Sequence, residues 1–240
     1  MASSRHRENA GTVTAEPART GSIRALREAA RSCRDCPLWK NATQTVFGEG
    51  LQRASVMLVG EQPGDQEDRQ GKPFVGPAGR LLDKALADAG IERSSLYVTN
   101  AVKHFKFLLR GKRRLHKTPA QLEIRACHQW LAGEIASIHP RLIVAMGATA
   151  ARAVLGKVTA IEPNRGRVIR PHDDPTVGIG AHILVTVHPS YLLRLRTQDR
   201  KLAYRRFVAD LHRILPYVSR ATDAARVRKA PSAFIERRVP

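Results

Sequence analysis

The polar residues between positions 60 and 83 directly follow an apolar run, and they have the composition of a binding site. This segment reads GEQPGDQEDRQGKPFVGPAGRLLD, with Glu61, Gln62 and Asp65 close to Phe74. The run before it fits a buried strand, and the leucines at its end have helical spacing. In open α/β sheets, ligands bind beyond the carboxyl ends of the strands, where this loop would lie. The alternative is a turn rich in glycine and proline with solvated carboxylates.

Other candidate site residues also follow apolar, strand-like runs. The amide of Asn100 offers a donor and an acceptor, which reading the edge of a base requires. His188 could donate a hydrogen bond to an anion that develops on a leaving group, and Phe74 could stack on a base. Each has a structural alternative. Asn100 could lie in a turn, His188 could have a structural role, and Phe74 could be a core aromatic residue.

The three cysteines favour a metal or cluster site over a disulfide framework. Cys33-x-x-Cys36 places two thiols on one tight turn, and Cys127 could supply a third ligand. A tetrahedral site needs one more ligand, and spacing alone does not separate an iron–sulfur cluster from zinc. Three unrelated buried thiols are the remaining alternative.

Residues 105–117 form a basic segment after Asn100, with five charged bases between Arg110 and Lys117. Phosphate is the expected partner of such a loop, and the attraction is usually non-specific and sensitive to salt. In that interpretation, His116 is one more surface side chain.

The elements that must position these residues alternate along the chain. Apolar runs predict strands, and helical spacing predicts helices between them, so we expect an α/β fold with a mostly parallel sheet covered on both faces. The expected strands are 56–59, 96–100, 142–146 and 183–187. The expected helices are 23–32, 79–89, 118–138, 148–155 and 199–215. Thr118 is the expected cap of the third helix, with Pro119 in its first turn.

Length and charge indicate one domain with a polyanionic partner. The 240 residues are 42% hydrophobic, which suits a single domain at 22–216 between an N-terminal tail, 1–21, and a basic C-terminal tail, 217–240. The formal charge of +20 points to nucleic acid ahead of an anionic membrane. No run is long enough to span a membrane, and residues 1–21 lack the apolar centre of a signal peptide. We therefore expect a cytoplasmic monomer.

Four motifs in this order resemble those of the uracil-DNA glycosylase superfamily. They are GEQPG, GKPFVGPAGRLLD, Asn100 in VTNAVK and His188 in VHPSYLLR, and they are most similar to the bacterial iron–sulfur members, the family 4 type and its UdgX relatives. The similarity covers roughly residues 32–213. It implies a three-layer α/β/α sandwich with a four-stranded, mostly parallel sheet. The implied reaction removes uracil from DNA, with single-stranded DNA as the expected substrate, double-stranded DNA as a further one, and free uracil as a product.

The resemblance also implies roles for individual residues. The implied catalytic residues are Glu61, Gln62, His116 and His188. The implied uracil-binding residues are Gln62, Asp65, Phe74, Asn100 and His188. The implied DNA-binding residues are Gly76, Pro77, Lys112, Arg113, Arg114, Ser190 and Arg194. Leu192, Leu193 or Arg194 would fill the space that a flipped nucleotide leaves.

The resemblance further implies a [4Fe-4S] cluster. In family 4 relatives a cysteine follows the Asn-x-x-Lys motif, and this chain has His104 at that position. The implied ligands are therefore Cys33, Cys36, His104 and Cys127. His128 is the rival fourth ligand, and zinc is the rival metal.

The sequence 112–117, KRRLHK, is similar to the loop that distinguishes the UdgX type, usually KRRIH, with Leu115 in place of isoleucine. In that type, the histidine attacks the anomeric carbon after uracil leaves and forms a covalent protein–DNA adduct. The resemblance implies that His116 is this nucleophile, with Glu61 as its orienting carboxylate. Two alternatives remain, a turnover glycosylase of the family 4 type and a non-catalytic, cluster-bearing DNA-binding module.

Overall fold

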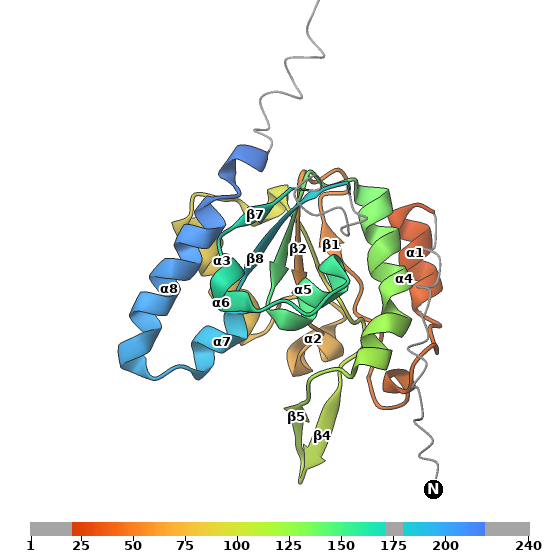
Figure 1. Ribbon diagram of the computed structural model, residues 1–240. Coiled ribbons are helices and arrows are strands. Elements are labelled where there is room, and N and C mark those ends of the chain that lie inside the picture. The colour runs from red at the N-terminus through yellow and green to blue at the C-terminus, as the bar shows by residue number, and fades with distance from the viewer. Residues whose placement is uncertain (1–20, 171–179, 219–240) are drawn as a thin grey trace, which may run out of the picture.

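The computed structural model describes residues 21–170 and 180–218, so the predicted tails lie almost wholly outside the described residues. A six-stranded sheet in the order β1-β3-β2-β6-β8-β7 forms the centre of the molecule (Figure 1). Its strands are β1 (Glu49–Gly50), β2 (Val56–Gly60), β3 (Tyr97–Asn100), β6 (Leu142–Met146), β7 (Val168–Ile169) and β8 (His182–Thr186).

The four central strands are parallel, because apolar side chains cover both of their faces and helices connect them. Each lies within one residue of the expected bounds at either end. The predicted four-stranded sheet was too small, since the short strands β1 and β7 add antiparallel pairs at the two edges. Each of these strands is only two residues long, which is too short for an alternating or apolar pattern to be recognised in the sequence.

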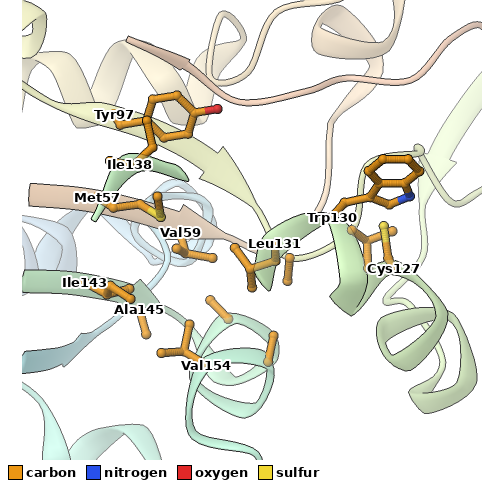
Figure 2. Close-up of a cluster of buried hydrophobic side chains, with 14 of the residues drawn as sticks. Met57, Val59, Tyr97, Cys127, Trp130, Leu131, Ile138, Ile143, Ala145 and Val154 are labelled. Carbon is orange, nitrogen blue, oxygen red and sulfur yellow. The ribbon is translucent and has the colours of Figure 1, made fainter. Parts of the chain in front are cut away.

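Helices cover both faces of the sheet and produce three layers (Figure 1). The first face carries α1 (Ile23–Ala30), α4 (Gln121–Ile138) and α5 (Ala148–Leu155), and the second carries α3 (Pro77–Asp88), α7 (Pro189–Arg194) and α8 (Thr197–His212). Alternate residues of β2 enter the two cores, with Met57 and Val59 on the first side and Val56 and Leu58 on the second. Figure 2 shows part of the first core, where Met57 and Val59 lie near Leu131.

The remaining described helices are short. They are α2 (Asp65–Gln70), α6 (Ile161–Asn164) and the single 3₁₀ turns η1 (Pro37–Lys40), η2 (Arg93–Ser95) and η3 (Leu215–Tyr217). The expected cap at Thr118 was wrong, because α4 begins at Gln121. Glu123 reaches back to accept the backbone N–H of Ala120, which satisfies an unpaired donor at the start of the helix.

The basic segment is a β-hairpin, where the sequence had predicted a loop. β4 (Phe107–Arg110) and β5 (Arg113–His116) pair antiparallel around Gly111 and Lys112. Figure 1 shows this hairpin projecting from the body, outside the main sheet. In the described part of the chain, no helix is both long and apolar enough to cross a lipid bilayer.

Candidate active site

The site lies at the carboxyl ends of β2 and β3, where the ladder between the strands continues past their last residues. Ala101 donates its N–H to the Gly60 carbonyl at 2.9 Å, and Val102 donates to the Glu61 carbonyl at 3.0 Å. These bonds fix the direction of the chain on both sides of the edge. The backbone at Glu61 and Asn100 is therefore fixed, and so are the positions from which their side chains extend.

A cavity of about 400 Å³ opens at this edge, and all five expected uracil-binding residues line it. These are Gln62, Asp65, Phe74, Asn100 and His188. Phe74 is buried at a backbone φ of 57°, a left-handed conformation that few residues with side chains adopt. Its ring centroid lies 5.9 Å from that of His188. A Cβ at Gly60 would collide with Phe74 and Asn100, so this glycine permits the close packing.

Asn100 presents an unused acceptor to the cavity. Its side chain is buried, and Oδ1 is a buried side-chain atom without a hydrogen-bond partner among the described residues. An unpaired buried acceptor costs about 1–3 kcal/mol, so such atoms are rare outside sites that a ligand completes. The cavity therefore offers a place for an N–H donor on a flat ring.

His188 is held as a neutral donor. Its Nδ1 accepts the backbone N–H of Ser190 at 3.2 Å and lies 2.8 Å from the Ser190 hydroxyl, in the cap of α7. An Nδ1 that accepts must carry no proton, which leaves the proton on Nε2. Burial, together with the charge of Arg194 and that of His116 when it is protonated, lowers the pKa of His188 to about 4. The neutral Nε2–H is therefore available near neutral pH.

The hairpin brings His116 to the same edge, next to Glu61. The His116 Nε2 atom lies 3.5 Å from Oε1 of Glu61 and 2.9 Å from Nε2 of Gln62. Thr149, at the start of α5, donates its hydroxyl to the other Glu61 oxygen at 2.6 Å. Burial lowers the pKa of His116, and Arg194 adds to this effect while Glu61 opposes it. A neutral imidazole thus lies beside a carboxylate at the mouth of the cavity.

A second cavity of about 360 Å³ adjoins the first and contains Glu61 in its lining. Both cavities are lined by His116, His188 and Ser190. A molecule that fills both would therefore pass between the two histidines. Chemically, the arrangement can hold a flat heterocycle in one cavity, stabilise a negative charge with His188, and present a nucleophile to an atom between the cavities.

Gln62 and Asp65 line the first cavity, but their side chains are bonded to other groups. The Gln62 amide bridges the base of the hairpin, accepting from the backbone N–H of Lys106 at 3.0 Å and donating to the Lys117 carbonyl at 2.9 Å. The Asp65 carboxylate pairs with Arg114 and, at 3.0 Å, with Arg69. In this structure, the Gln62 and Asp65 side chains bond to the hairpin and to α2, and they hold these elements in place.

Arg114 also differs from its expected place at the DNA backbone. Its guanidinium turns inward and pairs with Asp65 and, at 2.6 Å, with the fully buried Asp68 of α2. The same group lies over the rings of Phe105 and Phe107, at 5.4 and 5.1 Å from their centroids. Arg114 and His116 both belong to β5. The ion pairs of Arg114 with α2 therefore fix the hairpin and, with it, the position of His116.

The other expected DNA-contacting residues lie around the two cavities or on the hairpin. Lys112 and Arg113 are exposed at the hairpin tip, Pro77 lines the first cavity, and Arg194 lines both. Gly76 donates its N–H to the buried Glu67 at 2.7 Å. Of the residues expected to fill a vacated space, Leu192 is fully buried, whereas Leu193 is exposed beside the first cavity.

Glu67 was missed in the sequence, whereas Thr149 lies in a segment, 147–149, that was noted after a predicted strand but given no role. Glu67 accepts the N–H groups of Gly64 and Gly76, so it joins two loops that line the first cavity. Thr149 holds Glu61. The position of Thr149 directly after the strand β6 was the available signal for it. Nothing in the spacing of Glu67 distinguished it from the other acids of α2.

The expected cluster ligands lie on the first face of the sheet. Cys127 accepts the Lys103 N–H at 3.2 Å, and Cys33 accepts the indole N–H of Trp130 at 3.1 Å. Figure 2 shows Cys127 next to Trp130. Burial raises the pKa of Cys127 to about 12, and the nearby Cys33 and Cys36 add to this rise. Such a thiol keeps its proton until a cation replaces it.

The fourth expected ligand, His104, has its Nε2 3.0 Å from the Thr45 hydroxyl, and burial lowers its pKa. Within residues 21–170 and 180–218, no three histidine, cysteine or carboxylate side chains are grouped tightly enough to hold one metal ion. Two of the three sulfurs, those of Cys127 and Cys33, accept N–H groups, and hydrogen bonds of this kind support cluster thiolates.

Comparison with known proteins gives a consistent set of similarities. A family model described as the uracil DNA glycosylase superfamily matches residues 47–212. A type-4 uracil-DNA glycosylase of Thermotoga maritima is 39% identical over 173 residues, covering 72% of this chain and 83% of the relative. One of Pyrobaculum aerophilum is 34% identical over 197 residues, covering 80% and 97%. A type-5 uracil-DNA glycosylase of the same organism is 29% identical over 215 residues, covering 80% and 88%.

Proposed function

The chain belongs to the uracil-DNA glycosylase superfamily, and from this premise we propose that it excises uracil from DNA and then binds the deoxyribose covalently through His116. The observation that carries the proposal is the meeting of His116, Glu61 and His188 between two adjoining cavities. The names of the relatives support uracil excision in DNA. The position of His116 supports the covalent step.

The first cavity suits uracil better than cytosine. Uracil carries an N–H at N3, which the free Asn100 Oδ1 would accept, while the amide nitrogen donates to O4. Cytosine has a lone pair at N3 and an amino group at position 4, so both contacts would become repulsive. Phe74 would stack on the ring once the nucleotide has been flipped out of the strand.

Excision separates charge, and the site has a group for each sign. As the bond between N1 and C1′ breaks, uracil takes the electron pair and the sugar becomes an oxocarbenium ion. The Nε2–H of His188 would donate to the uracil oxygen that gains charge, and the Glu61 carboxylate would lie near the cationic sugar. The sugar would occupy the junction of the two cavities.

The next step fixes the fate of the sugar. The neutral His116 ring has a nitrogen lone pair, which would form a bond to C1′ and leave an imidazolium that Glu61, 3.5 Å from Nε2, would stabilise. Loss of the one remaining N–H proton of the ring to water completes a neutral adduct. Uracil leaves with a proton from solvent, so all charges balance.

The second candidate is a turnover glycosylase, which the names of the type-4 relatives favour. In that enzyme Glu61 would direct water to C1′, and His116 would only contact DNA. A non-catalytic DNA-binding module would leave the lone acceptor of Asn100 and the fixed tautomer of His188 without a use.

A uracil-release assay separates catalysis from mere binding. The protein is incubated with single-stranded oligonucleotides that carry uracil, cytosine or thymine at one position, and the free base is quantified. Release from the uracil strand alone is the expected result. No release of uracil at equimolar protein would overturn the proposed activity.

The pH dependence of adduct formation should reflect the lowered pKa of His116. An unperturbed histidine is half protonated near pH 6.5 and so loses half of its nucleophilic form there. Because the folded pKa is lower, the rate should fall to half of its maximum only below pH 6.5. Single-turnover rates of adduct formation from pH 5 to 8 test this. A half-maximal rate at or above pH 6.5 would contradict it.

We also propose that Cys33, Cys36, Cys127 and His104 hold a [4Fe-4S] cluster. A bound cluster would join the segment before η1 to α4 and to the end of β3, a structural role. Protein purified without oxygen should contain about four irons per chain and absorb broadly in the visible range. Replacing Cys127 by serine should lower the iron content and the melting temperature. Stoichiometric zinc without visible absorption would favour the alternative metal.

A further inference from the structure

The two faces of the β4–β5 hairpin differ in what they contact. Residues paired across an antiparallel ladder share a face, so Leu109 lies on the same face as its partner Arg114, and Phe107 on the same face as His116. We call this the inner face. The outer face carries the pairs Leu108 with Leu115 and Arg110 with Arg113.

The inner face is directed towards the site. Arg114 pairs with α2, and His116 lies beside Glu61. Leu109 comes next towards the tip on this face, and it is 69% exposed. Leu108 and Leu115 on the outer face are also exposed, at 54% and 40%, so the hairpin carries three exposed leucines, and Leu109 is the one that shares a face with His116.

Another exposed leucine lines the first cavity. Leu193 of α7 is 37% exposed and lines the cavity together with His116 of the hairpin. Figure 1 shows the hairpin and α7 at the same end of the sheet, with α2 between them. A strand that delivers one nucleotide into the cavity would therefore come close to both Leu193 and the hairpin.

We propose that Leu109 packs against the base next to the flipped nucleotide, on the side opposite Leu193, so that two leucines hold the strand open. This proposal rests on the proposed uracil excision. Apolar side chains that contact base faces stabilise unstacked nucleotides. Three cations without an acid, Arg110, Lys112 and Arg113, surround the tip, and this charge favours a nucleic-acid strand over an apolar protein partner.

The chain provides a matched control, because Leu108 and Leu109 are neighbours on opposite faces with similar exposure, 54% and 69%. Binding is measured by fluorescence anisotropy with a single-stranded oligonucleotide that contains 2′-fluoro-2′-deoxyuridine, whose glycosidic bond resists cleavage. Leu109→Ala should weaken binding roughly fivefold or more. Leu108→Ala should change the affinity less than twofold. Leu109→Met, which keeps a large apolar side chain, should bind nearly as tightly as the wild type.

A second readout locates the contact. With 2-aminopurine beside the fluorinated uridine, the wild-type complex should change the fluorescence on one flank, and Leu109→Ala should abolish that change. Circular dichroism melting of each variant checks that the fold is retained. Equal effects of the two alanine variants, or no effect of either, would overturn the role of Leu109 while uracil release by the wild type stands. Absence of uracil release would refute the proposed function and this inference with it.

Discussion

Replacing His116 by serine should abolish the covalent protein–DNA product completely while uracil release stays measurable. Serine lacks a nitrogen lone pair, and its hydroxyl is a weak nucleophile without a base placed to remove its proton. The smaller side chain also leaves room between the two cavities, where water can reach C1′ beside Glu61. The expected products are therefore free uracil and an abasic strand. Denaturing electrophoresis and quantified uracil report the two outcomes separately.

A histidine far from the cavities controls for the substitution. His212, the exposed last residue of α8, can be replaced by serine without touching the site. This variant should form adduct at the wild-type rate. Persistence of a covalent species in the His116→Ser protein would mean that another side chain attacks the sugar.

Replacing His188 by alanine should slow uracil release by roughly 10²–10³-fold, the usual cost of removing one donor to a developing anion. The reason is the fixed tautomer, because Ser190 occupies Nδ1 and directs Nε2–H towards the ligand. The loss should appear in the single-turnover rate. Affinity for the 2′-fluoro oligonucleotide should change only a few-fold, since the donor matters most when charge has developed.

These two measurements also separate a structural role from a chemical one. His188 caps α7, so its loss could disturb that helix. A disturbed helix would lower affinity and melting temperature together with the rate. Release at the wild-type rate by the His188→Ala protein would exclude it as the stabiliser of the leaving group.

Local patterns were sufficient for the strands and for several site residues. Leu142–Met146 is a continuous apolar run and could be placed from sequence to the residue. The motifs after such runs indicated Glu61, Asn100 and His188, because parallel strands present their carboxyl ends at one edge. The structure places all three at that edge.

The hairpin could have been predicted but was not. Two four-residue runs flank Gly111-Lys112, and Gly111 has a φ of 58°. A two-residue loop with glycine is a strong hairpin signal. The hairpin was not recognised because the segment is so rich in positive charge that it resembled a solvated loop.

The partners of Gln62, Asp65 and Arg114 could not be derived from local pattern. Arg114 meets Asp68 across 46 residues of sequence, and its direction depends on how the hairpin packs against α2. A charge in a basic run is usually solvated, and nothing in its neighbours marks one arginine as internal. Long-range ion pairs of this kind appear only in three dimensions.

The central claim is that His116 captures the sugar after uracil leaves. The most direct measurement incubates the wild-type protein with an equimolar, end-labelled uracil oligonucleotide and separates the products on a denaturing gel after heating in detergent. We predict a slow-migrating band, of protein and DNA together, that forms in proportion to released uracil and contains His116 in its crosslinked peptide. Full release of uracil with only free abasic strand and repeated turnover would contradict the covalent step.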